Sequence, residues 1–158
     1  MIMKKMVLFF LITFLAACQK PQPFDEASAT QEILDLHHAQ RAYHFEKRAE
    51  EFAGMMSADF ISVNGGIVSR PTYEENLQRF GNYFDSVEFI KWDDLSEPVI
   101  RFSDDGSLAY TIVDKEVILQ YGTEEGTMVK DTTHFAWTTI YRRVENGWKI
   151  ESVASTNE

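Results

Sequence analysis

Apolar and polar residues recur with two different periods along this chain, and the period changes near residue 85. Between Thr30 and Met56 the spacing predicts a long amphipathic helix, with Thr30 as its N-cap. One stripe recurs at intervals of three, four or seven and comprises Leu34, Arg41, Phe45, Phe52 and Met55/Met56, with Ile33, His37, Gln40 and His44 on the adjoining stripe. A second helical stretch runs from Arg70 to about Phe84, with Pro71 expected in its first turn. The remainder alternates as strands do, which predicts strands at 86–92, 98–103, 107–121, 128–144 and 147–155.

A short hairpin separates the two predicted helices. Residues 59–63 alternate like a strand, Asn64-Gly65-Gly66 is typical of a tight hairpin turn, and residues 67–69 return. Helices first and a run of hairpins afterwards predict an α+β domain, in which the helices pack on one face of a curved antiparallel sheet.

The first residues have the features of an export signal. Lys4-Lys5 precede an apolar run at 6–15, and the segment ends Leu-Ala-Ala-Cys18. The run is shorter than the roughly 20 residues that a membrane-spanning helix needs. The last four residues resemble the lipobox of bacterial lipoproteins, which implies that Cys18 is acylated and attaches the protein to the cell-envelope membrane. The position after it holds Gln19 and not aspartate, which in the Gram-negative lipoproteins implies the outer membrane. The alternative is an ordinary signal peptide followed by a cysteine.

Three segments are therefore expected: a lipoprotein signal peptide at 1–17, a proline-containing tether at 18–29 and one domain at 30–158. The whole chain has a net charge of −10, and residues 1–17 hold two lysines and no acid, so their removal leaves −12. Such a charge argues against nucleic acid as a partner and against electrostatic docking on anionic lipid. Cys18 is the one cysteine, so no disulfide is expected.

Several motifs in this order resemble the nuclear transport factor 2-like superfamily, and in particular its SnoaL-like branch, most of whose members have no known function. They are the long helix leading into residues 56–63, the Gly65-Gly66 turn, the helix start at 69–71, the strand at 106–111 and the hairpin formed by 137–141 and 147–150. The resemblance implies a cone made of a strongly bent antiparallel sheet and its helices, with an apolar pocket at the open end. It also implies a homodimer formed through the sheet.

Members of the superfamily are isomerases, dehydratases, hydrolases, or proteins that bind ligands without catalysis, so the fold alone does not decide the function. The enzymes resemble one another in placing a carboxylate or a His–Asp pair in the pocket as general base. The weak candidates for such a role here are His44, His134 and Asp59. None of them lies in a copy of a known catalytic pattern, and residues 152–155 carry no histidine where some relatives have one or two.

Aromatic and hydroxyl side chains are the better candidates for a ligand-binding surface. Phe135, Trp137, Thr139 and Tyr141 share one face of a predicted strand, although core packing alone would also explain them. Further candidates for the lining, whose faces the pattern does not assign, are Tyr43, His44, Trp92 and Lys115.

Two further polar groups have simple structural interpretations. His37 and His44 lie two helical turns apart and can face the same side, where a nearby carboxylate or water would satisfy them. Their spacing does not match a metal-binding pattern, and neither a metal nor a cofactor is expected. Asp93-Asp94 are expected to be solvated in a turn.

The leading hypothesis is a lipid-anchored envelope protein whose cone binds a small, mostly apolar ligand. The alternatives are an acid–base enzyme acting in the same pocket and a module for dimerisation or interaction.

Overall fold

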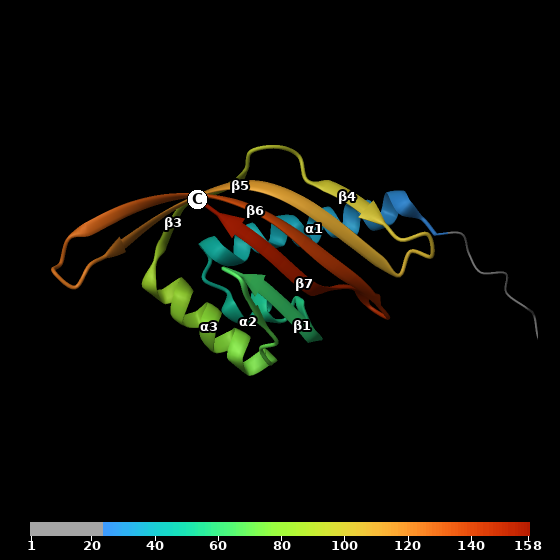
Figure 1. Cartoon of the computed structure of the whole chain (residues 1–158), viewed down its shortest axis with the longest axis horizontal. Coiled ribbons are helices and arrows are strands. Elements are labelled where there is room, and N and C mark those ends of the chain that lie inside the picture. The colour runs from blue at the N-terminus through green and yellow to red at the C-terminus, as the bar shows by residue number, and fades with distance from the viewer. Residues whose placement is uncertain (1–23) are drawn as a thin grey trace, which may run out of the picture.

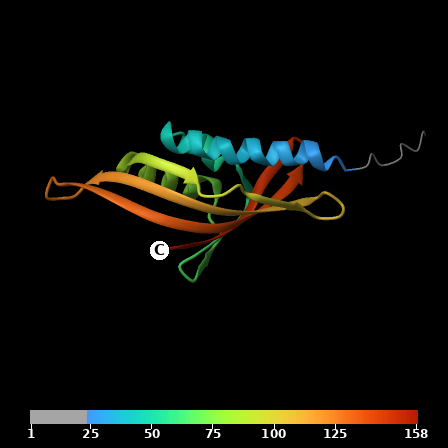
Figure 2. The ribbon, with the colours of Figure 1, turned by 90° about the horizontal axis from the view of Figure 1, so that it is seen from above.

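A long, bent sheet and three helices make up the molecule (Figure 1). The computed structural model describes residues 24–158. The helices are α1 (Glu26–Phe45), α2 (Ala49–Ala53) and α3 (Tyr73–Ser86). The strands are β1 (Met56–Asn64), β2 (Ile67–Ser69), β3 (Glu88–Asp94), β4 (Val99–Phe102), β5 (Leu108–Gly122), β6 (Met128–Val144) and β7 (Gly147–Asn157). Seen from above, α1 lies along one face of the sheet (Figure 2). The α+β class and the five predicted strands after residue 85 are confirmed.

The strand order is β2-β1-β7-β6-β5-β3, and β4 pairs with the other half of β5. All pairs are antiparallel except β1 with β7, which is parallel, so the expectation of a purely antiparallel sheet is wrong at that one pair. The pairing register shifts within β1–β7, β3–β5 and β6–β7. Irregularities of this kind bend a sheet, and here they accompany the curvature that forms the cone.

The first helix differs from the prediction at both ends. It begins at Glu26, and Asp25 is its N-cap, its carboxylate accepting from the Ser28 amide at 3.1 Å, so residues 24–29 belong to the domain and not to the tether. It also ends at Phe45, eleven residues before the expected end. Lys47 then adopts a left-handed conformation with φ 56°, and the short helix α2 follows.

The helix α3 starts at Tyr73, so Pro71 lies just before the helix and not in its first turn. Thr72 and Glu75 form a reciprocal capping box, with the Thr72 amide donating to the Glu75 carboxylate at 2.7 Å. The β1–β2 hairpin has the predicted Gly65-Gly66 turn, and both glycines have positive φ.

The buried stripe of α1 comprises Ala29, Ile33, His37, Gln40 and His44. The expected apolar stripe was the adjoining one, but two of its members, Arg41 and Phe45, are exposed. The structure thus buries three polar side chains of α1 against the sheet, and these lie where the site forms.

The predicted signal peptide, Cys18 and the first part of the tether lie outside the described residues. Within residues 24–158, no helix combines the length and the apolar character that crossing a membrane requires.

Candidate functional site

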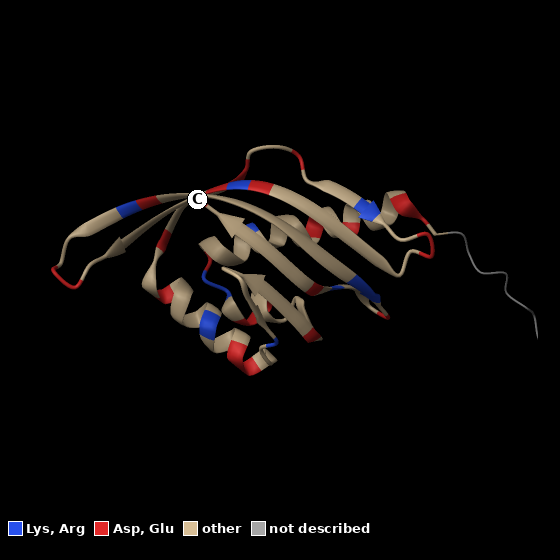
Figure 3. Ribbon diagram, viewed as in Figure 1, with Lys and Arg blue, Asp and Glu red and all other residues tan. Residues whose placement is uncertain are grey.

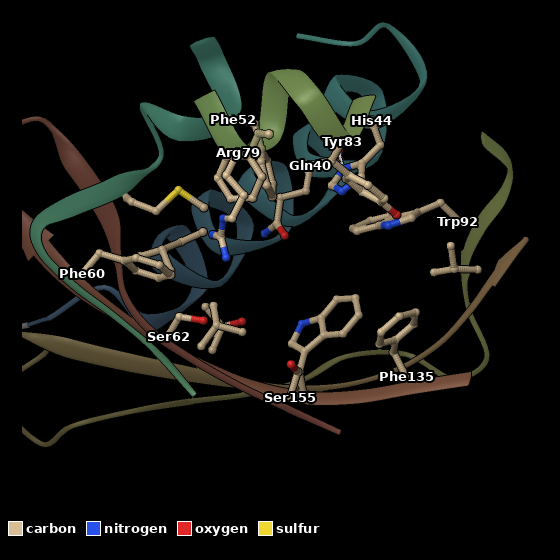
Figure 4. Close-up of a pocket in the computed structure, with 17 residues that line it drawn as sticks. Gln40, His44, Phe52, Phe60, Ser62, Arg79, Tyr83, Trp92, Phe135 and Ser155 are labelled. Carbon is tan, nitrogen blue, oxygen red and sulfur yellow. Dashed lines mark hydrogen bonds between the residues drawn. The ribbon is translucent and has the colours of Figure 1, made fainter. Parts of the chain in front are cut away.

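A cavity of about 430 Å³ lies between the three helices and the concave face of the sheet (Figure 4). Its lining is mostly apolar and aromatic and comprises Gln40, His44, Phe52, Met56, Phe60, Ser62, Arg79, Phe80, Tyr83, Trp92, Val117, Phe135, Trp137, Thr139, Ile150, Val153 and Ser155. The helices supply one wall, and alternate residues of the strands supply the other. A concave apolar space with a few polar groups is the usual form of a small-molecule site.

His44 lines this cavity from α1 and is only 7% exposed. Its ring stacks on Trp92, with 4.5 Å between the centroids, and packs edge-on against Phe52 and Phe89. The Nδ1 atom lies 2.6 Å from the Gln40 carbonyl oxygen, so this nitrogen carries the proton and donates it. Burial lowers the pKa of His44 to about 4. The imidazole is therefore neutral at pH 7, and its Nε2 is a hydrogen-bond acceptor.

Arg79 reaches the same cavity from α3. Its guanidinium donates to the Asn76 side chain at 2.9 Å and lies 4.6 Å from the Phe80 ring centroid. Burial lowers the pKa of Arg79, since part of the charge is removed from water, but an arginine remains protonated at any physiological pH. The cavity thus contains one permanent positive charge.

Hydroxyl groups from the sheet face the helices across the cavity. Ser62 comes from β1, Thr139 from β6 and Ser155 from β7. The Ser155 hydroxyl oxygen accepts from the Asn64 amide at 2.9 Å, which leaves its own proton available to a ligand.

A second, smaller cavity of about 150 Å³ adjoins the first. Its lining comprises His37, His38, Arg41, Trp92, Asp93, Asp94 and Lys115. In the described part of the chain, Trp92 is the residue that lines both spaces. Asp94 is central to this region: one of its oxygens lies 2.8 Å from His37 Nε2 and the other lies 2.5 Å from Lys115 Nζ. The expectation that Asp93-Asp94 merely solvate a turn is therefore wrong for Asp94, which ends β3 in a network with two buried side chains.

Neighbouring groups shift the pKa values of Asp94 and Lys115 in this network. Burial by itself would raise the pKa of Asp94, but hydrogen bonds from His37 and Lys115 bring it below the ordinary value. Lys115 is 1% exposed, and burial lowers its pKa although Asp94 opposes this. Its ammonium lies 3.7 Å from the Trp92 ring centroid, a cation–π distance. Trp92 thus contacts both the charged network and the neutral His44.

Five of the eight residues predicted to line a pocket do line the main cavity: His44, Trp92, Phe135, Trp137 and Thr139. The other three do not. Tyr43 packs under the Arg48 guanidinium, Lys115 lines the smaller cavity, and Tyr141 is fully buried with its hydroxyl 3.4 Å from the Gln40 amide. Tyr141 keeps the face of Phe135, Trp137 and Thr139, but it is packed in the core beneath α1 and so does not reach the cavity.

The weak catalytic candidates other than His44 lie away from both cavities. Asp59 is exposed on β1, and His134 is exposed on β6, where its backbone pairs with Glu158. His37 has the carboxylate partner that its structural interpretation requires, in Asp94. Within residues 24–158, no group of three or more His, Asp or Glu side chains is arranged to hold a metal ion.

Sequence reasoning missed most of the helical wall. Arg79 and Tyr83 are one turn apart on α3, next to the more buried Asn76 and Phe80. This i, i+4 pair beside an apolar stripe was a usable signal for a lining position. No local signal marked Ser62, Val153 or Ser155, because they reach the cavity only through the bend of β1 and β7.

No protein-family model and no curated protein sequence matches this chain. Solved structures do match. A protein from Exiguobacterium sibiricum, proposed as a calcium/calmodulin-dependent kinase II association domain, has a TM-score of 0.67 at 18% identity, over 85% of this chain and 97% of the other. A nuclear transport factor 2-like protein from Cytophaga hutchinsonii has a TM-score of 0.63 at 15% identity, over 85% and 100%.

A protein from Streptomyces avermitilis, proposed as a dehydratase of the nuclear transport factor 2-like family, has a TM-score of 0.64 at 12% identity, over 82% of this chain and 96% of the other. At such identities the likeness concerns the fold and carries no residue's role across. The bent sheet, the helices on its concave face and these similarities together establish that the chain has the nuclear transport factor 2-like, cystatin-like fold.

Proposed function

We propose that this protein binds a small, mostly apolar molecule in the main cavity. The observation that carries the proposal is the cavity itself, about 430 Å³ in volume and lined mostly by aromatic and aliphatic side chains. A cone filled by its own side chains would instead have favoured a pure interaction module. The flat faces of Trp92, Trp137 and Phe135 suit a planar or elongated body, and the neutral His44 offers it one acceptor.

Fluorescence of N-phenyl-1-naphthylamine, an apolar probe with one N–H donor, tests the proposal. The dye should brighten and saturate with the wild-type chain. Val153→Trp, which places a bulky ring in the cavity, should abolish the signal. Ala154→Trp is the matched control, since the neighbouring residue points out of the sheet and is exposed. Equal binding by both variants would contradict a site in the cavity.

An acid–base enzyme in the same cavity is the second candidate. In its favour, His44 is a titratable group on the cavity wall and is able to accept a proton. A pKa of about 4 makes it a weak base at pH 7, and the His37–Asp94 pair lines the smaller cavity and not the main one. Liquid chromatography with mass spectrometry of compounds incubated with the protein distinguishes the candidates. Compounds recovered with the same mass and retention time favour binding, whereas loss of water, gain of water or a new peak of equal mass favours a dehydratase, a hydrolase or an isomerase.

We also propose a homodimer through the outer face of the sheet. Tyr110, Ile112 and Ile140 are 39–48% exposed on adjacent strands of that face. Lys, Arg, Asp and Glu are absent from residues 132–141 of β6 and 152–157 of β7 (Figure 3). Light scattering should give twice the monomer mass, and Ile112→Lys should return the mass to that of a monomer.

Attachment to the outer membrane through acyl groups on Cys18 completes the proposal. Membrane fractionation should place the protein in the outer membrane, and Cys18→Ala should release it.

A further inference from the structure

The charge of the main cavity differs in sign from that of the protein. The chain has 25 acidic and 15 basic residues, yet no Asp or Glu among residues 24–158 lines this cavity. His44 is neutral at pH 7, so the charge of the lining is the single positive charge of Arg79. Arg79 is an exposed residue, so its guanidinium stands where the cavity opens to solvent and can be reached by an anion that enters.

The contacts of Arg79 leave its charge unpaired. Its guanidinium donates to the neutral Asn76 amide and lies over Phe80. No carboxylate lies within 4 Å of it among residues 24–158, whereas the guanidiniums of Arg41, Arg48 and Arg142 each pair with an acid. Several donors of the Arg79 fork are therefore free to bind a ligand.

Figure 4 shows where this fork points. The Arg79 side chain descends from α3 into the cavity, and Ser62 lies on the opposite side. Phe135 and Trp92 lie farther along the cavity, toward the other end of the view. One end of the space therefore has a guanidinium and a hydroxyl beside Phe60, and the other end has the rings of Trp92 and Phe135.

We infer that the ligand is an amphipathic monocarboxylate, whose carboxylate binds Arg79 while its apolar body lies against Trp92, Phe135 and Trp137. This inference rests on the proposed binding function and specifies its ligand class. A planar carboxylate matches the guanidinium fork with two parallel hydrogen bonds. Its single negative charge equals the single positive charge of the cavity, whereas a phosphate monoester would leave negative charge without a partner.

Calorimetric titration with acid–amide pairs tests the inference. 1-Naphthylacetic acid and 1-naphthylacetamide share one aromatic body, and decanoic acid and decanamide share one aliphatic body. Within at least one pair, the acid should bind about tenfold or more tightly than the amide at pH 7, as expected for hydrogen bonds between charged groups. Comparing the two acids then shows whether the cavity binds an aromatic or an aliphatic apolar body more tightly.

Three variants test whether Arg79 causes the preference for the acid over the amide. Arg79→Met keeps the length of the side chain and removes the charge, so acid and amide should bind equally. Arg79→Lys keeps the charge without the fork and should retain part of the preference. Arg101→Met is the matched control, because Arg101 is an exposed arginine of β4 whose guanidinium donates to the Ile100 carbonyl oxygen. This control should keep the full preference.

The outcomes separate this inference from the proposed function. Equal binding of acid and amide by the wild type, with the naphthylamine dye still bound, overturns the carboxylate and leaves an apolar site. A preference that persists in Arg79→Met overturns the role of Arg79. If Arg79→Met loses the dye and both ligands, its cavity is damaged and Arg79→Lys decides the role: an undiminished preference for the acid in that variant overturns the bidentate role of Arg79. Failure of the wild type to bind any probe overturns both proposals.

Discussion

The buried imidazole of His44 makes the stability of this protein depend on pH in a defined window. The perturbation is a fall from pH 7.0 to pH 4.5. At pH 7.0 the imidazole is neutral in both the folded and the unfolded chain. At pH 4.5 an unfolded imidazole, whose ordinary pKa is 6.5, is protonated, while the folded one, with a pKa of about 4, is mostly not. At pH 4.5 the unfolded chain therefore binds more protons at this site than the folded chain does, and this difference shifts the equilibrium towards unfolding.

The magnitude follows from these two pKa values. Between pH 7.0 and pH 4.5 the differential protonation removes about 2 kcal/mol from the free energy of unfolding. The full value applies without a large correction for solvent, because His44 is only 7% exposed. For a domain of this size, it corresponds to a fall of about 1–2 M in the urea midpoint.

The assay compares urea unfolding at the two pH values in the wild type, His44→Leu and His38→Leu. His38 is an exposed histidine of the same helix and controls for the loss of an imidazole. The wild type and His38→Leu should lose stability by about 2 kcal/mol more than His44→Leu does. Carboxylates contribute equally to all three chains and cancel. The same loss in His44→Leu as in the wild type would refute the argument that burial in the cavity wall keeps His44 neutral.

Two further predictions concern stability alone. A double-mutant cycle on Lys115→Met and Asp94→Asn, measured by urea unfolding, should give a coupling energy of about 2 kcal/mol. This exceeds the coupling of exposed ion pairs, because Lys115 is only 1% exposed. A coupling energy below about 0.5 kcal/mol would contradict a strong pair. Gly106→Ala should lower the thermal midpoint more than Gly65→Ala. Both positions have positive φ, but only at Gly106 does the new Cβ fall 2.3 Å from a Phe24 ring carbon; equal shifts would show that the ring moves aside freely.

Elements whose causes are local were predictable from the sequence. The alternation of apolar residues placed five strands within two residues of their observed bounds. The Gly65-Gly66 turn was readable because a two-residue hairpin needs positive φ. The break after Phe45 was not readable, since no glycine or proline marks it. It exists because the chain turns at Lys47 and lets Phe52 of α2 pack against His44.

The candidate site was predictable in part for the same reason. A strict period of two places Phe135, Trp137 and Thr139 of β6 on one face, and all three line the cavity. Period alone did not show that Tyr141 leaves this lining, because its burial depends on α1, whose Gln40 amide lies 3.4 Å from the Tyr141 hydroxyl.

The sequence by itself determined the fold class, the strands of the sheet and the apolar character of the concave surface, because these depend on residues near one another in the chain. Only the tertiary structure decided which polar groups enter the cavity. Arg79 and Ser62 come from different elements, and Asp94 meets His37 across 57 positions of sequence. Their charge, pairing and burial arise from packing between distant segments, which no local period encodes.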